Sequence, residues 1–70
     1  MKLVLPGQIV RKDRLRKGLS QVQLARAIGV VQSDISKLEH GWRPITIAMA
    51  TKLANVLGTD PALYVSARQR

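Results

Sequence analysis

Four polar side chains between positions 32 and 37 have the chemistry and the spacing needed to read the edges of base pairs. If this segment is helical they share one side of it, because residues four apart stack on the same face of an α-helix. A glutamine amide can donate one hydrogen bond and accept another, which matches adenine in the major groove of DNA, and serine can pair with several bases. The base-contacting residues predicted on this ground are Gln32, Ser33, Ser36 and Lys37, where Lys37 suits a guanine or a phosphate equally well.

Two short helices joined by a tight turn are predicted to hold this face in place. Ser20 is a good N-cap and Gln23 three residues later completes a capping box, so a helix should start there and run to Ile28. Gly29 ends it, and a second helix should occupy residues 32–39. Helix, turn and helix in this order are typical of domains that lay the second helix in the major groove.

The rest of the chain is predicted to add three helices. The first should cover residues 8–17, the fourth should lie between its cap Thr46 and Gly58, and the fifth should cover residues 61–65, where proline follows a capping aspartate. We therefore expect an all-α fold, a compact five-helix domain. The helix that begins at Ser20 should bury one apolar face, made of Val22, Leu24, Ala25 and Ile28.

One domain is expected at residues 7–66, because a chain of 70 residues has space for a single core. Residues 1–6 should form an N-terminal arm and residues 67–70 a frayed basic tail. The arm is apolar enough for a short strand or a contact with another subunit, and also short enough to be unstructured. The sequence does not choose between these.

The net charge of the chain indicates what kind of partner it binds. The sequence has twelve Lys and Arg and four Asp and Glu, which gives a formal net charge of +8. Such a field attracts polyanions. Nucleic acid is favoured as the partner, ahead of an anionic membrane surface or an acidic protein.

Other function classes are excluded by the residues that are missing. With no Cys, one His, four scattered acidic residues and no Gly-rich phosphate loop, the chain is not expected to be an enzyme or to need a cofactor. His40 has no Cys or carboxylate cluster beside it, so no metal site is expected. Since no run of 18 apolar residues exists, we expect a soluble, cytoplasmic protein with no membrane partner.

Residues spread over all five predicted helices carry a family resemblance. Arg14, Gly18 to Gln21, Leu24-Ala25, Gly29-Val30, Ile35, Leu38-Glu39, Gly41 and Leu53 to Gly58 together resemble the Cro/C1-type (XRE) helix-turn-helix family of phage and bacterial regulators, over roughly residues 7 to 65. The resemblance implies a domain that binds double-stranded operator DNA, usually as a dimer on a near-palindrome.

The resemblance also implies roles for single residues. Gln21 should contact a phosphate and brace Gln32, and Arg14 and Glu39 should form a partly buried structural ion pair. Trp42 should pack, on the core or on a dimer partner. The DNA backbone contacts implied in this way are Ser20, Gln21, His40 and Arg43.

Two positions depart from the family pattern. Val31 stands where relatives carry a capping Ser or Thr, so the third helix lacks a side-chain cap that contributes about 1 kcal/mol. Asp13 stands where relatives carry an apolar residue, which indicates either a shifted first helix or a partner for a nearby Arg. A homodimer is expected to use the exposed side of the last helix, at Leu63, Tyr64 and Val65, with the arm as a second choice.

The leading functional hypothesis is a dimeric repressor of its own or a nearby promoter, controlled by its concentration. The alternative is an antitoxin that also binds a protein toxin, because residues 41–65 are similar to HigA-type antitoxins. A general coactivator or a control protein for restriction-modification is a third class consistent with the same residues.

Overall fold

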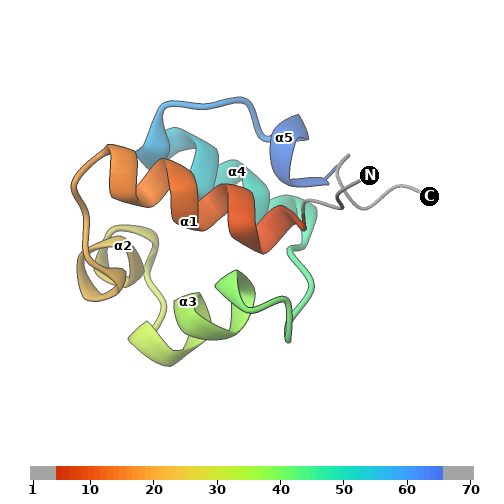
Figure 1. Cartoon of the computed structure of the whole chain (residues 1–70). Helices are drawn as coiled ribbons and strands as arrows, with labels where there is room; N and C mark the ends of the chain where they lie inside the picture. The colour runs from red at the N-terminus through yellow and green to blue at the C-terminus, as the bar shows by residue number, and fades with distance from the viewer. Residues whose placement is uncertain (1–4, 66–70) are drawn as a thin grey trace.

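The computed structural model describes residues 5–65, which form five α-helices (Figure 1). Their bounds are α1 Pro6–Arg16, α2 Gln21–Ile28, α3 Gln32–Glu39, α4 Ile47–Leu57 and α5 Ala62–Val65. The predicted all-α, five-helix fold is confirmed. The predictions for the first four residues of the arm and for the basic tail lie outside the described residues.

Local signals explain where the helices begin and end. The hydroxyl oxygen of Ser20 accepts from the backbone N–H of Gln23 at 3.0 Å, while the side chain of Gln23 accepts from the N–H of Ser20 at 2.8 Å, as the capping box predicts. Gly29 ends α2 with a φ of +81°, a conformation that costs L-residues with a side chain about 1 to 2 kcal/mol. Val31 makes no side-chain cap bond to α3, also as predicted.

The first helix starts two residues earlier than predicted. Pro6 is its first helical residue, because proline has no N–H to lose at that position and its φ already suits a helix. The side-chain oxygen of Gln8 accepts from the backbone N–H of Leu5 at 3.0 Å and so caps this start. The predicted start of this helix at Gln8 is therefore wrong by two residues.

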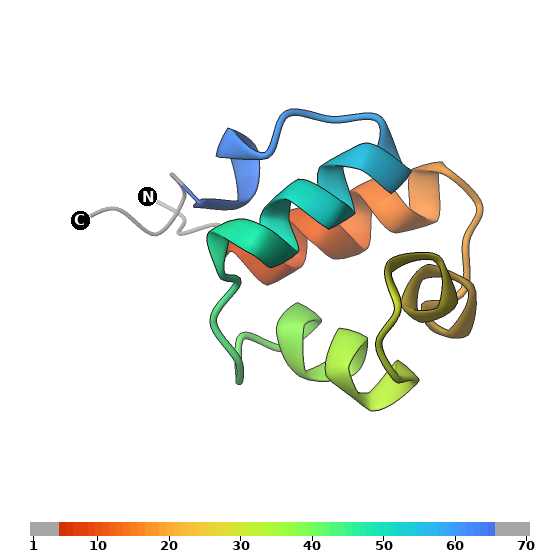
Figure 2. The same ribbon diagram turned by 180° about the vertical axis from the view of Figure 1, so that it is seen from behind.

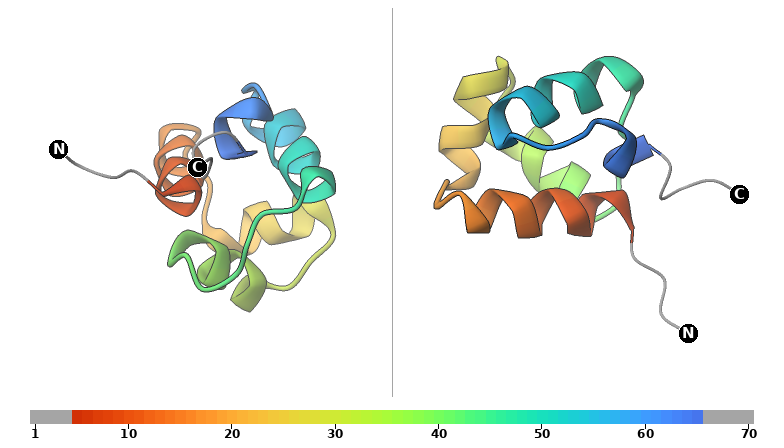
Figure 3. Two further views of the ribbon diagram at one scale, coloured as in Figure 1. Left: turned by 90° about the vertical axis from the view of Figure 1, so that its right-hand side faces the viewer. Right: turned by 90° about the horizontal axis from the view of Figure 1, so that it is seen from above.

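The five helices surround one apolar core. α2 and α3 pack on each other, and α3 also packs on α1 (Figure 2). α5 closes the opposite side, against α1 and α4 and close to the start of each (Figure 3). The buried apolar residues are Val10, Leu24, Ala25, Ile28, Ile35, Leu38, Ile45, Ala50, Leu53, Ala54, Leu57 and Tyr64.

Gly7 allows α1 to meet the end of α3. A Cβ built on Gly7 would lie 1.9 Å from the backbone oxygen of Leu38, which is far inside any tolerated contact. The absence of a side chain at this position therefore sets the closeness of α1 and α3, and through it the position of the residues at the end of α3.

Two predictions about buried faces are corrected by the structure. Val22 is 47% exposed, because the buried side of α2 is completed by Leu24, Ala25 and Ile28 without it. Tyr64 has no exposed surface, so it does not belong to an exposed side of α5 as predicted.

Tyr64 is buried because Asp13 offers it a partner. Its hydroxyl donates to Oδ2 of Asp13 at 2.9 Å and lies 2.7 Å from the hydroxyl of Thr59. The other carboxylate oxygen of Asp13 accepts from Arg16 at 2.8 Å. Of the two explanations offered for Asp13, a nearby Arg partner is therefore present. Burial raises the pKa of Tyr64 to about 12, and the hydrogen bond to Asp13 adds to the rise.

Candidate nucleic-acid interface

The outward side of α3 carries the four side chains predicted to contact bases. Gln32, Ser33 and Lys37 are exposed and Ser36 is half-buried. Ile35 and Leu38 point into the core from the opposite side of the same helix. The structure thus brings all four candidates onto one polar, uncovered surface, which is the shape and chemistry that a major groove accepts.

A buried ion pair ties α1 to the end of α3. Nε of Arg14 donates to Oε2 of Glu39 at 2.6 Å, and Nη2 donates to Oε1 at 3.1 Å. The third donor of Arg14, Nη1, bonds the backbone oxygen of Leu19 at 2.8 Å. The pair expected from the sequence is present, and it satisfies both charges inside the fold, as buried charges require.

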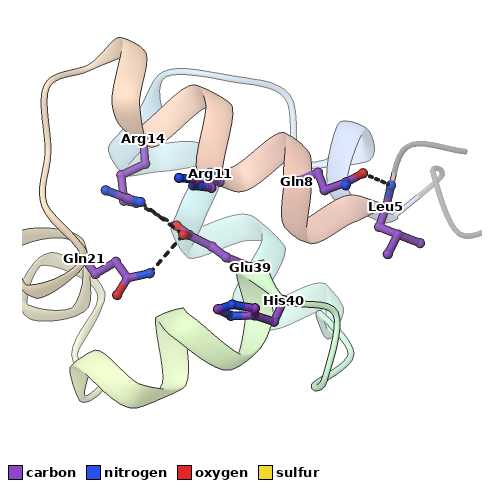
Figure 4. Close-up of a pocket in the computed structure, with 7 residues that line it drawn as sticks. All are labelled: Leu5, Gln8, Arg11, Arg14, Gln21, Glu39 and His40. Carbon is purple, nitrogen blue, oxygen red and sulfur yellow. Dashed lines mark hydrogen bonds and ion pairs between the residues drawn. The ribbon is translucent and has the colours of Figure 1, made fainter. Parts of the chain in front are cut away.

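The same carboxylate begins a chain of hydrogen bonds that reaches the surface of α3. Nε2 of Gln21 donates to Oε1 of Glu39 at 3.0 Å, and Nε2 of Gln32 donates to Oε1 of Gln21 at 2.6 Å. Figure 4 shows the inner part of this chain, with Arg14 and Gln21 both bonded to Glu39. Gln21 thus braces Gln32, as the resemblance implies.

A polar pocket of about 450 Å³ opens beside this chain, between α1 and the ends of α2 and α3 that face it. Arg11 and His40 line it together with Arg14 and Gln21, and these side chains lie around the same opening in Figure 4. Arg11 was not among the residues predicted for this site. Its position three residues before Arg14 places it on the same face of α1, which is the signal that could have found it.

The residues after α3 form a small surface of their own. Nδ1 of His40 donates to the backbone oxygen of Ser36 at 2.8 Å, so only Nε2 remains for a contact outside the chain, and it can donate to a phosphate only when it also carries a proton. The rings of His40 and Trp42 stack with centroids 4.5 Å apart. Trp42 is 72% exposed, so the expectation that it packs on the core is wrong, because the imidazole ring supplies a stacking partner at the surface.

The other two residues predicted to contact the DNA backbone, Arg43 and Ser20, differ in whether their donors are already bonded within the chain. Arg43 is engaged within the chain, since its Nη1 lies 2.5 Å from Oδ1 of Asp34 in α3. Ser20 is exposed, and its hydroxyl oxygen accepts the capping bond, so that its O–H can still donate to a phosphate. The structure places Ser20 and Gln21 at the start of α2, where the unpaired N–H groups of the first turn favour an anion.

No helix within residues 5–65 is long and apolar enough to cross a membrane. In the same range no three His, Cys, Asp or Glu side chains gather as a metal site would require.

Comparisons with known proteins agree on one family. The family model described as "Helix-turn-helix" matches residues 10–64. RamB of Mycobacterium tuberculosis, an HTH-type transcriptional regulator, is 33% identical over 60 residues, which are 86% of this chain and 13% of RamB. The chain therefore spans a small part of the length of this relative.

Three solved structures share the fold over most of their length. SinR, a master regulator of biofilm formation solved in complex with DNA, has a TM-score of 0.80 at 27% identity, with 87% of this chain and 98% of SinR covered. The restriction-modification controller protein C.AhdI of Aeromonas hydrophila has a TM-score of 0.80 at 37% identity, with coverages of 89% and 94%.

The third structure is an addiction module antidote protein of the HigA family from Coxiella burnetii. Its TM-score is 0.79 at 26% identity, and the match covers 97% of this chain and 75% of the antidote protein. Fold, capping pattern and family model agree. The chain belongs to the Cro/C1-type (XRE) family of helix-turn-helix proteins.

Proposed function

We propose that this protein binds double-stranded DNA sequence-specifically and regulates transcription, with α3 as the helix that enters the major groove. The observation that carries the proposal is the bond between Gln32 and Gln21, which fixes a base-reading amide on an exposed helix before any DNA arrives. The net charge of +8 supports it, because phosphate contacts supply much of the affinity of such proteins.

In this proposal the residues of the surface divide into two groups. Gln32 reads adenine, and Ser33, Ser36 and Lys37 contact neighbouring bases, with guanine or phosphate as the target of Lys37. The DNA backbone is held from both ends of the helix pair, by Ser20, Gln21, His40 and Arg43. Phosphate contacts fix the register of the protein on DNA, and base contacts specify the sequence.

The active form is proposed to be a homodimer that works in the cytoplasm without catalysis. A single helix contacts only a few base pairs, so two copies about 34 Å apart are needed to define one site. Leu63, which is 45% exposed, and the half-buried Val65 remain as interface candidates on α5. Tyr64 is withdrawn from this interface because it is buried within the monomer.

Selection from random duplex DNA at roughly physiological salt tests the proposal. We expect enrichment of a near-palindrome, and sedimentation of the protein with the selected duplex as two chains per duplex. A salt titration separates specific from general binding, because affinity that depends on phosphates alone falls steeply with salt for every sequence. Equal, weak binding to all sequences would contradict the proposal.

A second candidate function is that of an antitoxin, and the similarity to the HigA-family antidote protein favours it. Such a protein would bind a protein toxin in addition to its own operator. Co-expression with the product of a neighbouring small gene tests this: a stable complex that restores growth supports the antitoxin role, and no interaction with that product contradicts it.

A further inference from the structure

We infer that Glu39 is a positioning residue that fixes which way the amide of Gln32 faces, and that it thereby sets a preference for adenine over guanine. This inference rests on the proposed function, in which Gln32 reads a base. It adds a specificity role to a buried carboxylate that the family resemblance treats as structural.

The argument begins with what a carboxylate can do. Glu39, buried and paired with Arg14, accepts hydrogen bonds and donates none. An amide group that faces it must therefore present its NH2 side. Gln21 does so, with its Nε2 at 3.0 Å from Oε1 of Glu39.

The orientation of the Gln21 amide in turn fixes the orientation of the Gln32 amide. Since Nε2 of Gln21 faces Glu39, its Oε1 faces Gln32, and an oxygen there can only accept. Gln32 must then present its own NH2 side, as it does at 2.6 Å. One charged group in the interior thus decides the direction of both amides, because reversing either one would place two oxygens or two NH2 groups against each other.

The outward side of Gln32 is fixed as a result. One N–H of Gln32 is used by Gln21, so one N–H and the side-chain oxygen remain for a base. Adenine offers an acceptor at N7 and a donor at its amino group, which match this pair. Guanine offers two acceptors, so its O6 would meet the oxygen of Gln32.

The substitution Glu39→Gln tests the inference with almost no change of shape. A glutamine at position 39 can accept from Nε of Arg14 with its oxygen in the place of Oε2 and donate to Gln21 with its NH2 group in the place of Oε1, with loss of the bond from Nη2 of Arg14. Gln21 would then turn over and donate to the oxygen of Gln32, so neither N–H of Gln32 is used by the brace and its NH2 group takes the place of the oxygen that met O6 of guanine.

The measurement is the ratio of Kd values for two duplexes that differ only in adenine or guanine at one position. That position is the one in the selected half-site where Gln32→Ala abolishes the base preference of the wild type. We expect the wild type to prefer adenine by on the order of tenfold or more. In Glu39→Gln the ratio should fall at least tenfold or reverse.

Arg14→Lys is the matched control. It weakens the same buried pair but leaves Glu39 as an acceptor, so stability should fall while the ratio stays at the wild-type value. A merely structural role of Glu39 predicts that both variants leave the ratio unchanged. Circular dichroism at the assay temperature establishes that each variant is folded.

Gln21→Met keeps the inference testable if Glu39→Gln does not fold. It removes the intermediate amide and leaves Arg14 and Glu39 paired, so Gln32 can turn freely and the ratio should fall below the wild-type value. Loss of a phosphate contact at Gln21 would weaken both duplexes alike and would not change the ratio.

The possible failures are distinguishable. If no position in the wild-type site depends on Gln32, base reading by α3 is wrong and the proposed function needs revision. If the wild type prefers adenine and both Glu39→Gln and Gln21→Met keep that preference, DNA reading stands and the positioning role of Glu39 is contradicted.

Discussion

Gln32 of α3 donates its side-chain N–H to the amide oxygen of Gln21 of α2 across 2.6 Å, so the first side chain of the exposed helix is already held in place. Ordering a free side chain at an interface costs about 0.5–1.5 kcal/mol. A brace within the protein removes much of this cost at the moment of binding. It also couples the reading surface to the interior of the fold through Glu39.

Gly7→Ala is expected to destabilise the domain by at least about 3 kcal/mol, because the new Cβ would overlap the backbone of α3 near Leu38 and backbone cannot move aside as a side chain can. Urea denaturation measures the loss. Gly29→Ala is the control: it has a φ of +81° but open space around its Cβ, so it should cost about 1 to 2 kcal/mol. Equal losses in the two variants would contradict the close approach of α1 and α3.

Arg14→Met should lower the free energy of unfolding by about 3–5 kcal/mol, because it leaves the carboxylate of Glu39 buried without its partner. The double substitution Arg14→Met with Glu39→Met should recover most of that loss, since apolar side chains of similar size carry no desolvation cost. Thermal and urea unfolding of the two single variants and the double variant measure the coupling. Losses that simply add would argue against a buried pair.

Tyr64 makes stability depend on pH in the alkaline range. Burial raises the pKa of Tyr64 from 10.0 to about 12 in the folded protein, with a further contribution from Asp13. A raised folded pKa favours the folded state while the phenol is protonated, so this stabilisation is complete below pH 10 and is lost as the pH rises from 10 to about 12.

Tyr64→Phe should remove this part of the pH dependence and should also cost about 1–3 kcal/mol below pH 10, because Asp13 loses a buried donor. Unfolding curves of the wild type and the variant across that range measure the difference. Parallel declines of the two proteins with pH would show that Tyr64 does not titrate differently on folding.

Asp34→Asn should tighten binding to DNA of any sequence. Asp34 holds Arg43, and it also places a negative charge on the helix that faces the phosphates. In the wild type Asp34 competes with a phosphate for Arg43, so its removal should strengthen that contact and steepen the slope of log affinity against log salt by up to about 0.9. Stability should change by less than about 1 kcal/mol, because the pair is partly exposed.

Filter binding or fluorescence anisotropy over a range of salt gives that slope. Adding Arg43→Gln to Asp34→Asn is the control and should abolish the steepening, with a slope at or below the wild-type value. An unchanged slope in Asp34→Asn would mean that Asp34 does not compete with a phosphate for Arg43.

Local sequence signals were sufficient for most of the fold and for the surface of α3. Ser20 and Gln23 cap their helix through bonds three residues apart, and Gly29 ends it by its own conformation, so both could be predicted from neighbours alone. The exposed face of α3 could be predicted because its apolar residues, Ile35 and Leu38, are spaced to lie together on the opposite side of a helix. Tyr64 could not be predicted in the same way, because a four-residue helix has no period that separates its inner from its outer side.

The bonds that organise the site join residues far apart in the chain. Gln32 and Gln21 are 11 residues apart, Gln21 and Glu39 are 18 apart, and Arg14 and Glu39 are 25 apart. The pair and the brace were expected through family resemblance. The hydrogen bond that Gln21 donates to Glu39, which joins them into one chain, depends on the packing of α1, α2 and α3 and has no signal in local sequence.

The most direct test of the account is the ratio of Kd values for a scrambled and a selected duplex, measured for the wild type and for Gln32→Ala at one salt concentration. If α3 reads DNA through Gln32, the variant should keep its affinity for the scrambled duplex and lose about 1–3 kcal/mol on the selected one. An equal loss on both duplexes, or none on either, would contradict the claim that this side chain reads sequence.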